Sequence, residues 1–207
     1  MKILFVRHGS TAMNEKGLHQ KPDEPLSKEG LRQAVRVARR LKNAGAGLIV
    51  SSKCRRAMQT AQEISKATGK RVVYTNLLNE CEPPSEFHGK EYAEKSVARI
   101  KDAIWAHSAD PGWHYSDEEN LFEQRDRALK AIAYLESKKA DALIVVTHAI
   151  IMRMILFVGI FGKDADLSDT FRKFREGLGT HNAAITECEI DEGRFRLITY
   201  NDRTHLA

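Results

Sequence analysis

Cysteine is scarce in this chain of 207 residues, and its three cysteines cannot build a framework. Cys54, Cys81 and Cys188 are odd in number, lie far apart and include no Cys-x-x-Cys pair. This spacing argues against a small disulfide-rich fold and against a zinc site built on paired cysteines. Unpaired cysteines are typical of a reducing compartment, so we expect a cytoplasmic protein.

Long apolar runs are also few. Near the amino end the only such run is Ile3–Val6, which is shorter than the core of a secretory signal peptide. The stretch Leu143–Phe161 is longer, but polar and charged side chains interrupt it at Thr147, His148 and Arg153. We interpret it as a strand, a polar turn and a buried helix in succession, and we expect no membrane partner.

The sequence has no block of five or more Lys and Arg residues, and its basic residues do not alternate with aromatic ones. It has 33 Lys and Arg against 28 Asp and Glu, a formal net charge of +5. A charge so small and so evenly spread does not make the basic patch of a nucleic-acid-binding surface. We therefore expect no nucleic acid partner, and the mild excess of positive charge fits a small anionic substrate.

Short β-branched runs alternate with segments of helical periodicity along the chain. Strands are expected at residues 2–6, 48–50, 71–75, 142–147, 183–190 and 195–200, the last two joined by a turn at 191–193. Helices are expected from Ser27 to about Gly45, from about Arg55 to Gly69, over most of 85–140 with a break at 110–112, and from about Ile150. This alternation predicts an α/β fold, a three-layer αβα sandwich whose mostly parallel sheet gains an antiparallel edge strand from the terminal hairpin. We expect a single domain over residues 1–207, in which the irregular stretch at about 80–120 forms a lid-like helical insertion.

Basic side chains follow three of the expected strands. Arg7 and His8 end the first strand, Arg55 and Arg56 follow the second, and His148 follows the fourth. Ligands of open α/β sheets bind at the carboxyl ends of parallel strands, so we expect these groups to converge. Such a pocket has no acidic cluster for a divalent metal, whereas guanidinium groups suit the oxygens of a phosphoryl group. The pattern predicts a phosphate-binding pocket with a histidine able to attack or to transfer protons.

The order of these segments resembles the histidine phosphatase superfamily, the family with the phosphoglycerate mutase-like fold. The resemblance covers nearly the whole chain. It is carried by Arg7-His8-Gly9 with Thr11 and Asn14, by Pro25-Leu26-Ser27 with Gly30 and Gln33-Ala34, by Ser52-x-x-x-Arg56-Ala57-x-Gln59-Thr60-Ala61, by Leu78-Asn79-Glu80, by Val145-Val146-Thr147-His148 and by Asn182-Ala183-Ala184-Ile185-Thr186. The third of these segments places the pocket arginine at Arg56 rather than Arg55.

The resemblance implies roles for four basic side chains. His8 would be the nucleophile that forms a phosphohistidine, which divides one hard displacement into two easier ones. Arg7, Arg56 and His148 would hold the phosphoryl oxygens and stabilise charge during transfer. A small phosphorylated substrate is expected, with no metal and no other cofactor.

Three further residues complete the expected site. Asn14 would add a neutral donor, and Thr11, from the same opening signature, is expected among the substrate-binding residues. Glu80 would protonate the leaving oxygen and then activate water. Glu82 lies two positions away and would point the same way on an extended chain, so it is the alternative acid.

Two departures from the family pattern bear on the reaction. Ala149 stands where many members have glycine after the second histidine, and Cys81–Phe87 differs from the aromatic-glycine segment of the mutases. The long insertions with which mutases retain a bisphosphorylated intermediate are not seen either. We therefore expect a metal-independent phosphatase acting on a phosphomonoester. A phosphoglycerate-type mutase, a phosphohistidine protein phosphatase and a non-catalytic phosphate-binding module on the same fold are the alternatives, and the sequence does not set the oligomeric state.

Overall fold

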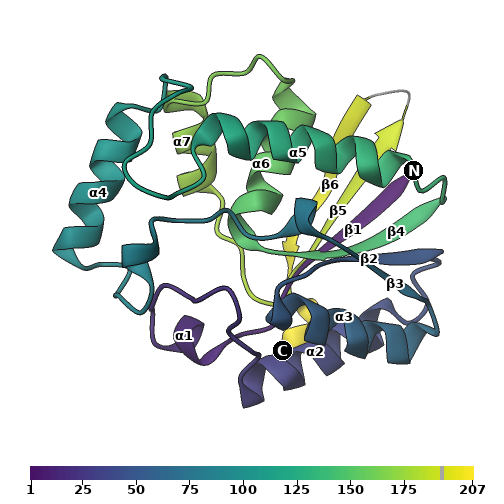
Figure 1. The fold of residues 1–207 in the computed structure, drawn as a ribbon. Coiled ribbons are helices and arrows are strands. Elements are labelled where there is room, and N and C mark those ends of the chain that lie inside the picture. Colours follow the sequence, from purple (N-terminus) through teal and green to yellow (C-terminus); the bar gives the residue numbers. More distant parts are fainter. Residues whose placement is uncertain (192–193) are drawn as a thin grey trace.

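The computed structural model describes residues 1–191 and 194–207, and a six-stranded sheet forms its centre (Figure 1). The strand order is β3-β2-β4-β1-β5-β6. The strands are β1 Lys2–Arg7, β2 Leu48–Ser52, β3 Val72–Thr75, β4 Ala142–Thr147, β5 Ile185–Asp191 and β6 Arg194–Asp202. The first four pair in parallel, whereas β5 is antiparallel to β1 and β6 is antiparallel to β5. The expected α/β fold with a mostly parallel sheet is confirmed.

The terminal hairpin lies at one edge of the sheet, as expected. β5 pairs with β1, and β6 forms the edge itself and pairs antiparallel with β5. Residues 192 and 193 of the expected turn at 191–193 lie outside the described residues.

Helices cover both faces of the sheet, which makes it the middle of three layers (Figure 1). The α-helices are α1 Ala12–Glu15, α2 Lys28–Leu41, α3 Arg55–Thr68, α4 Lys95–Ala106, α5 Leu121–Glu136, α6 Ala149–Phe161 and α7 Asp169–Gly177. Short 3-10 helices occur at η1 Asn76–Leu78, η2 Ser85–Phe87 and η3 Thr204–Leu206. Helices α2 and α3 pack on one face and α5 and α6 on the other, while α4 lies away from the sheet, at the left of Figure 1.

Strand β1 shows how one short run builds both cores. Ile3 and Phe5 pack into the core on the α5 and α6 side, and the alternate residues Leu4 and Val6 pack into the core on the α2 and α3 side. A strand buried on both faces carries an unbroken apolar run instead of alternating polar residues. The same holds for β4, which is buried along its whole length.

Two helix boundaries agree with their sequence signals. The Ser27 hydroxyl caps α2 by accepting the N–H of Gly30 at 2.9 Å. α3 stops at Gly69, whose φ of 69° is left-handed and is adopted by glycine without strain. α2 itself ends at Leu41, earlier than the expected stop at Gly45.

The segment 85–140 is less helical than expected, and two helices were not expected at all. α4 and α5 are separated by the irregular residues 107–120, so the expected break at 110–112 is wider. The Glu118 carboxylate holds this stretch by accepting the N–H groups of Tyr115 and Ser116 at 2.6 and 2.8 Å. α1 is a single turn, and α7 has only Phe171 and Phe174 on the side that packs on the core, so neither has an apolar stripe long enough to signal it.

The stretch Leu143–Phe161 divides into β4 and α6 with a turn between them, which confirms the interpretation of its polar interruptions. Among residues 1–191 and 194–207, no helix is both long enough and apolar enough to cross a bilayer.

Candidate active site

A close contact between two glycines fixes the carboxyl end of β1, where Arg7 and His8 stand. Gly9 packs on the backbone of Gly30 at the start of α2, and a Cβ on Gly9 would stand only 2.4 Å from the Gly30 oxygen. The N–H of Gly9 donates to Thr60 Oγ1 on α3 at 3.1 Å. Only glycine allows so close an approach of two backbones. The Arg-His-Gly sequence therefore ties the end of β1 to both α2 and α3.

The His8 ring is held in one tautomer. Its Nδ1 lies 2.7 Å from the carbonyl of Gly9, which can only accept, so Nδ1 carries the proton. Its Nε2 keeps a lone pair and accepts a hydrogen bond from Arg56 Nε at 3.3 Å. Burial, together with the charges of Arg56 and Arg7, holds the pKa of His8 well below its usual value. His8 is therefore neutral at pH 7, and its unprotonated Nε2 faces the Arg56 guanidinium.

Arg56 lies in the first turn of α3 and is only 3% exposed. Its Nη1 donates to two backbone carbonyls of the loop before α2, at 3.3 and 3.1 Å, while its Nε faces His8. The side chain of the neighbouring Arg55 is 52% exposed and reaches Asp23 only at 4.0 Å. The structure thus places Arg56 in the pocket and Arg55 on the surface.

His148 enters the same pocket from β4, the strand beside β1. It is fully buried at the N-terminus of α6, and its ring centroid lies 4.9 Å from that of His8. Burial, and then the charges of Arg56, His8 and Arg7, lower the pKa of His148 well below its usual value. His148 is therefore neutral at pH 7 as well.

Two residues to which the sequence analysis gave no role fix the tautomer of His148. Asn79 Oδ1 accepts the N–H of Lys53 at 3.0 Å and the hydroxyl proton of Ser52 at 2.9 Å. Ser52 Oγ has then no proton left for His148, so His148 Nε2 is the donor in their 2.8 Å contact. His148 Nδ1 is left deprotonated and buried, without a partner among the described residues. The signal for Ser52 was its place in the Arg56 motif, and the signal for Asn79 was its place before Glu80.

Arg7 completes the pocket. Its Nη1 donates to the carbonyl of Thr180, and its Nε is buried without a partner among the described residues. Burial lowers the pKa of Arg7, and the nearby Glu80 carboxylate opposes that effect. A buried N–H without an acceptor is costly unless a ligand supplies one. The structure brings four of the expected residues together, and we call this group the pocket floor: Arg7, His8, Arg56 and His148.

Glu80 borders the pocket floor at the N-terminus of α6. Its Oε1 accepts the N–H groups of Cys81, Ile150 and Ile151 at 3.0, 3.1 and 3.0 Å. Its Oε2 has only a 3.2 Å contact, to the N–H of Ile150. Oε1 is therefore saturated, whereas Oε2 keeps a lone pair that can hold a proton. The alternative acid, Glu82, is exposed and makes no side-chain hydrogen bond to the described residues.

Asn14 and Thr11 have different surroundings. Asn14 Oδ1 accepts from Asn182 Nδ2 at 3.2 Å, and Asn182 Nδ2 also donates to the His8 carbonyl at 3.0 Å. Thr11 caps α1: its Oγ1 accepts the N–H of Asn14 at 3.1 Å and donates to Gln20 Oε1 at 3.2 Å. Asn14 thus borders the pocket floor, whereas the Thr11 hydroxyl is used within the protein.

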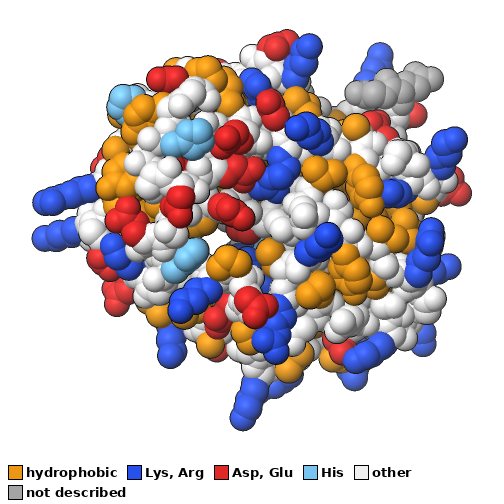
Figure 2. Space-filling model, viewed as in Figure 1, with side chains coloured by type: hydrophobic (Ala, Val, Ile, Leu, Met, Phe, Trp, Pro, Cys, Tyr) orange, Lys and Arg blue, Asp and Glu red, His pale blue; other side chains and the backbone are white. Residues whose placement is uncertain are grey.

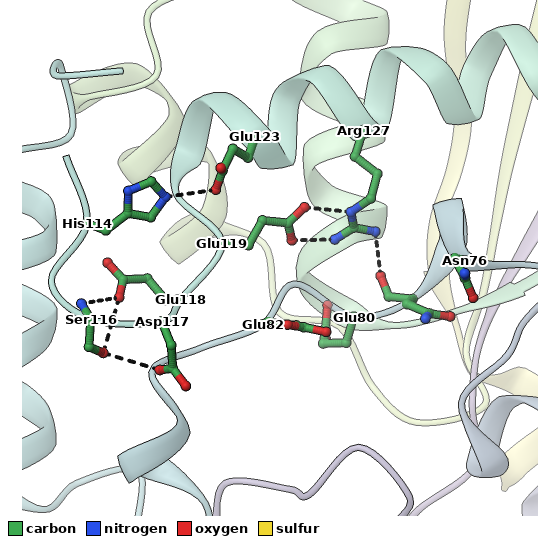
Figure 3. Close-up of a pocket in the computed structure, with 11 residues that line it drawn as sticks. Asn76, Glu80, Glu82, His114, Ser116, Asp117, Glu118, Glu119, Glu123 and Arg127 are labelled. Atoms are coloured by element: carbon green, nitrogen blue, oxygen red, sulfur yellow. Dashed lines mark hydrogen bonds and ion pairs between the residues drawn. The ribbon is translucent and has the colours of Figure 1, made fainter. Parts of the chain in front are cut away.

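A cavity of about 840 Å³ opens beside Glu80. We call its acidic side the acidic wall, formed by Glu80, Glu82, Asp117, Glu118, Glu119 and Glu123. Figure 2 shows Asp and Glu side chains gathered around a hollow near the middle of the face that it presents. Figure 3 shows that several of them have partners: His114 lies 3.0 Å from Glu123, and Arg127 lies 2.6 Å from Glu119.

The donor set also bears on metals and disulfides. Within the part of the chain that the structure describes, no group of three or more His, Cys, Asp or Glu side chains is placed to hold a metal ion. Cys54, Cys81 and Cys188 are free thiols. The positive charge of the pocket floor comes from guanidinium groups.

Comparison with known proteins agrees with this geometry. The chain is 36% identical to a probable phosphoglycerate mutase, GpmB, from Escherichia coli over 81 residues, which are 39% of this chain and 38% of that protein. This match therefore spans about two fifths of the relative's length.

Solved structures match over nearly the whole chain. A mycobacterial glucosyl-3-phosphoglycerate phosphatase superposes with a TM-score of 0.80 at 25% identity, covering 98% of this chain and 99% of that one. A phosphoserine phosphatase from Entamoeba histolytica, in complex with phosphoserine, superposes with a TM-score of 0.82 at 21% identity, covering 100% of this chain and 99% of that one. The family model described as histidine phosphatase superfamily (branch 1) matches residues 3–203. The chain belongs to the histidine phosphatase superfamily.

Proposed function

We propose that the protein is a metal-independent phosphatase that hydrolyses a phosphomonoester through a phosphohistidine at His8. The observation that carries the proposal is the fixed tautomer of His8. The Gly9 carbonyl holds the proton on Nδ1, and the lone pair of Nε2 faces Arg56 at 3.3 Å. A buried, neutral imidazole in this orientation is ready to attack phosphorus at pH 7.

In the first half-reaction, the pocket floor would bind the phosphoryl oxygens. The guanidinium groups of Arg56 and Arg7 would bind these oxygens, and the Nε–H of Arg7 has no acceptor among the described residues. His8 Nε2 would form a bond to phosphorus as the ester P–O bond breaks. A proton from Glu80 Oε2 would go to the leaving oxygen, which departs as an alcohol. The Gly9 carbonyl would stabilise the positive charge of the phosphorylated ring through Nδ1–H.

In the second half-reaction, water would attack the phosphohistidine. Glu80, now a carboxylate, would accept a proton from the water as its oxygen bonds to phosphorus. The bond between phosphorus and Nε2 would break, and neutral His8 and inorganic phosphate would result. In both half-reactions His148 would donate from Nδ1 to a phosphoryl oxygen, after the bound anion raises its proton affinity and Nδ1 takes up a proton from solvent water. Nδ1 has no other partner among the described residues.

The expected substrate is a small phosphorylated compound. The relatives named above include phosphatases of glucosyl-3-phosphoglycerate and of phosphoserine, which supports this class. The cavity of about 840 Å³ beside Glu80 gives room for the part of the substrate that leaves as an alcohol. We infer that residues 80–120, a lid-like insertion in one domain spanning 1–207, set which leaving group is accepted. On this proposal Asn14 is a further donor, and Thr11 supports it by capping α1.

The mutase alternative has one specific observation in its favour, the 36% identity to a probable phosphoglycerate mutase over 81 residues. A mutase would return the phosphoryl group from His8 to a second hydroxyl of the substrate instead of to water. Incubation with 3-phosphoglycerate separates the two reactions, because a phosphatase releases inorganic phosphate and a mutase forms 2-phosphoglycerate.

The His8→Ala variant tests the proposal most simply. It is expected to abolish turnover of a generic aryl phosphate while the thermal unfolding curve and circular dichroism stay those of a folded protein. Adding a chelator to the unaltered protein is expected to change nothing. Full activity of His8→Ala, or loss of activity with the chelator, contradicts the proposal.

A further inference from the structure

Arg127, on α5, makes a dense set of contacts for a side chain outside the pocket floor. Its Nε and Nη2 both donate to the Glu119 carboxylate, at 2.6 Å each. Its Nη1 donates to the carbonyls of Leu77 and Asn79 at 3.1 and 2.8 Å. Figure 3 shows the guanidinium between Glu119 and the chain segment that carries Glu80. One planar cation thus joins α5, the end of the 107–120 stretch and the segment before Glu80.

The segment Leu77–Cys81 has no regular structure after Leu78. Its backbone conformation is therefore held by contacts with other segments, those of Arg127 among them. Besides Arg127, the hydroxyl of Thr147 donates to the Leu78 carbonyl at 2.8 Å. The Asn79 side chain is held by Ser52 and Lys53, as described above. Arg127 alone among these side chains donates to two carbonyls of the segment, those of Leu77 and Asn79. Glu80 follows Asn79 directly.

The surroundings of the ion pair between Arg127 and Glu119 favour its persistence. Arg127 and Glu119 are only 18% and 16% exposed, so water screens their ion pair weakly. Burial alone would lower the pKa of Arg127, but the hydrogen bonds to Glu119 and the nearby Cys81 outweigh it and raise the pKa. The guanidinium therefore stays charged, and it presents five N–H donors in one fixed plane.

We propose that Arg127 is a positioning residue, which holds the Leu77–Cys81 segment so that Glu80 Oε2 faces the leaving oxygen. This inference rests on the proposed role of Glu80 as the proton donor. Lysine cannot replace Arg127 fully, because a single ammonium cannot reach two carbonyls and a carboxylate in one plane.

The test compares kcat on substrates with good and poor leaving groups. Loss of a purely structural contact would lower kcat equally on both. An aryl phosphate has a good leaving group and needs little protonation, whereas an alkyl phosphate needs a proton donor. General acid catalysis is worth about 10²- to 10⁴-fold in rate. Arg127→Met is therefore expected to lower kcat for an alkyl phosphate by about 10²-fold or more, and kcat for p-nitrophenyl phosphate by less than about 5-fold. Arg127→Lys is expected to fall between Arg127→Met and the unaltered protein on the alkyl substrate.

The matched control is Arg125→Met, on the same helix two residues away. Arg125 binds the adjacent Asp126 at 2.8 Å and makes no hydrogen bond to the Leu77–Cys81 segment. It is expected to keep both activities. Thermal unfolding of all variants identifies any general loss of folding, and Arg127→Lys remains informative if Arg127→Met does not fold.

The double variant Glu80→Gln with Arg127→Met separates failure of this inference from failure of the proposed function. If Arg127 acts through Glu80, the double variant is no slower on the alkyl phosphate than Glu80→Gln alone. Equal losses on both substrates, no loss at all, or additive losses in the double variant overturn the positioning role. If Glu80→Gln alone keeps full alkyl phosphatase activity, the proposed role of Glu80 falls, and the inference about Arg127 falls with it.

Discussion

The pocket floor and the acidic wall meet at Glu80, but their charged groups differ in how fully the protein itself supplies them with hydrogen-bond partners. In the floor, His8, Arg56 and His148 are buried beside the half-buried Arg7. Arg7 and His148 each keep a buried nitrogen without a partner among the described residues. In the wall, most carboxylates have a donor from the protein itself. Glu118 takes two backbone N–H groups and Glu119 takes Arg127.

This difference separates binding from scaffolding. Buried cations that repel each other have their proton affinity lowered, and an incoming dianion relieves that repulsion. Burial and neighbouring cations lower the pKa values of Arg7, His8 and His148, as this picture requires. Carboxylates that are already satisfied gain little from a ligand. We infer that the floor attracts the substrate, whereas the wall, apart from Glu80, mainly shapes the cavity.

Removing a charged side chain from the floor is expected to have the largest effect on activity, and it tests whether the floor binds the substrate. Arg56→Met is expected to lower kcat/KM for any phosphomonoester by about 10²- to 10³-fold, because it removes a buried donor to the transferring group. The matched control, Arg55→Met, changes an exposed neighbour and is expected to stay within about 2-fold, since surface charges contribute little. Steady-state kinetics on one aryl phosphate compares the two. Equal effects of the two variants would show that the floor has no special role.

The dependence of the free energy of unfolding on pH tests whether the two histidines of the floor are neutral and buried. His8 and His148 bind protons less readily in the folded state than in the unfolded state, whose ordinary value is 6.5. The unfolded state therefore binds more protons as the pH falls below about 6.5, and each histidine lowers the free energy of unfolding by up to about 1.4 kcal/mol per pH unit. His19, whose pKa burial lowers to about 4, adds to the same trend.

Urea unfolding from pH 7 down to pH 5 measures this slope. His148→Gln, in which the amide can still donate to Ser52, is expected to reduce the slope, and saturating inorganic phosphate is expected to oppose the acid loss. A His148→Gln variant as acid-sensitive as the unaltered protein would contradict the assignment of a neutral, buried His148.

Substitutions in the wall other than at Glu80 are expected to change stability rather than catalysis. Glu118→Ala removes the acceptor of two backbone N–H groups and is expected to lower the free energy of unfolding by about 1–3 kcal/mol. Its kcat on p-nitrophenyl phosphate is expected to change by less than about 2-fold, since none of its contacts involves the floor. Urea unfolding and steady-state kinetics on the same preparation provide both values. A large fall in kcat with unchanged stability would give Glu118 a catalytic role and contradict this division.

The sequence predicted the floor better than the surroundings of the floor. Apolar runs that stop at polar residues mark the ends of β1 and β4, and parallel strands bring those ends together, so Arg7, His8 and His148 follow from local patterns. The choice of Arg56 over Arg55 needed the family resemblance, because both follow β2 directly. Residue type alone does not say which of two adjacent side chains turns inward.

The residues that the sequence did not predict are held by contacts between segments far apart in the chain. Ser52 and Asn79 meet across 27 positions, and Arg127 and Asn79 meet across 48 positions. No periodicity records such pairs, since each is created only when strands and helices pack. Thr11 has a structural role that the sequence did not reveal: its hydroxyl caps α1, a helix too short to leave a pattern. Its expected part in substrate binding stays a prediction.

The central claim, that phosphate passes through the His8 ring, is tested most directly by trapping. Brief exposure of the protein to an aryl phosphate, followed by denaturation and mass spectrometry of peptides kept at alkaline pH, measures phosphate on each residue. The account predicts an acid-labile phosphoryl group on His8 Nε2 that is lost in His8→Ala. Turnover without any phosphate on His8, or with phosphate trapped on another residue, would contradict it.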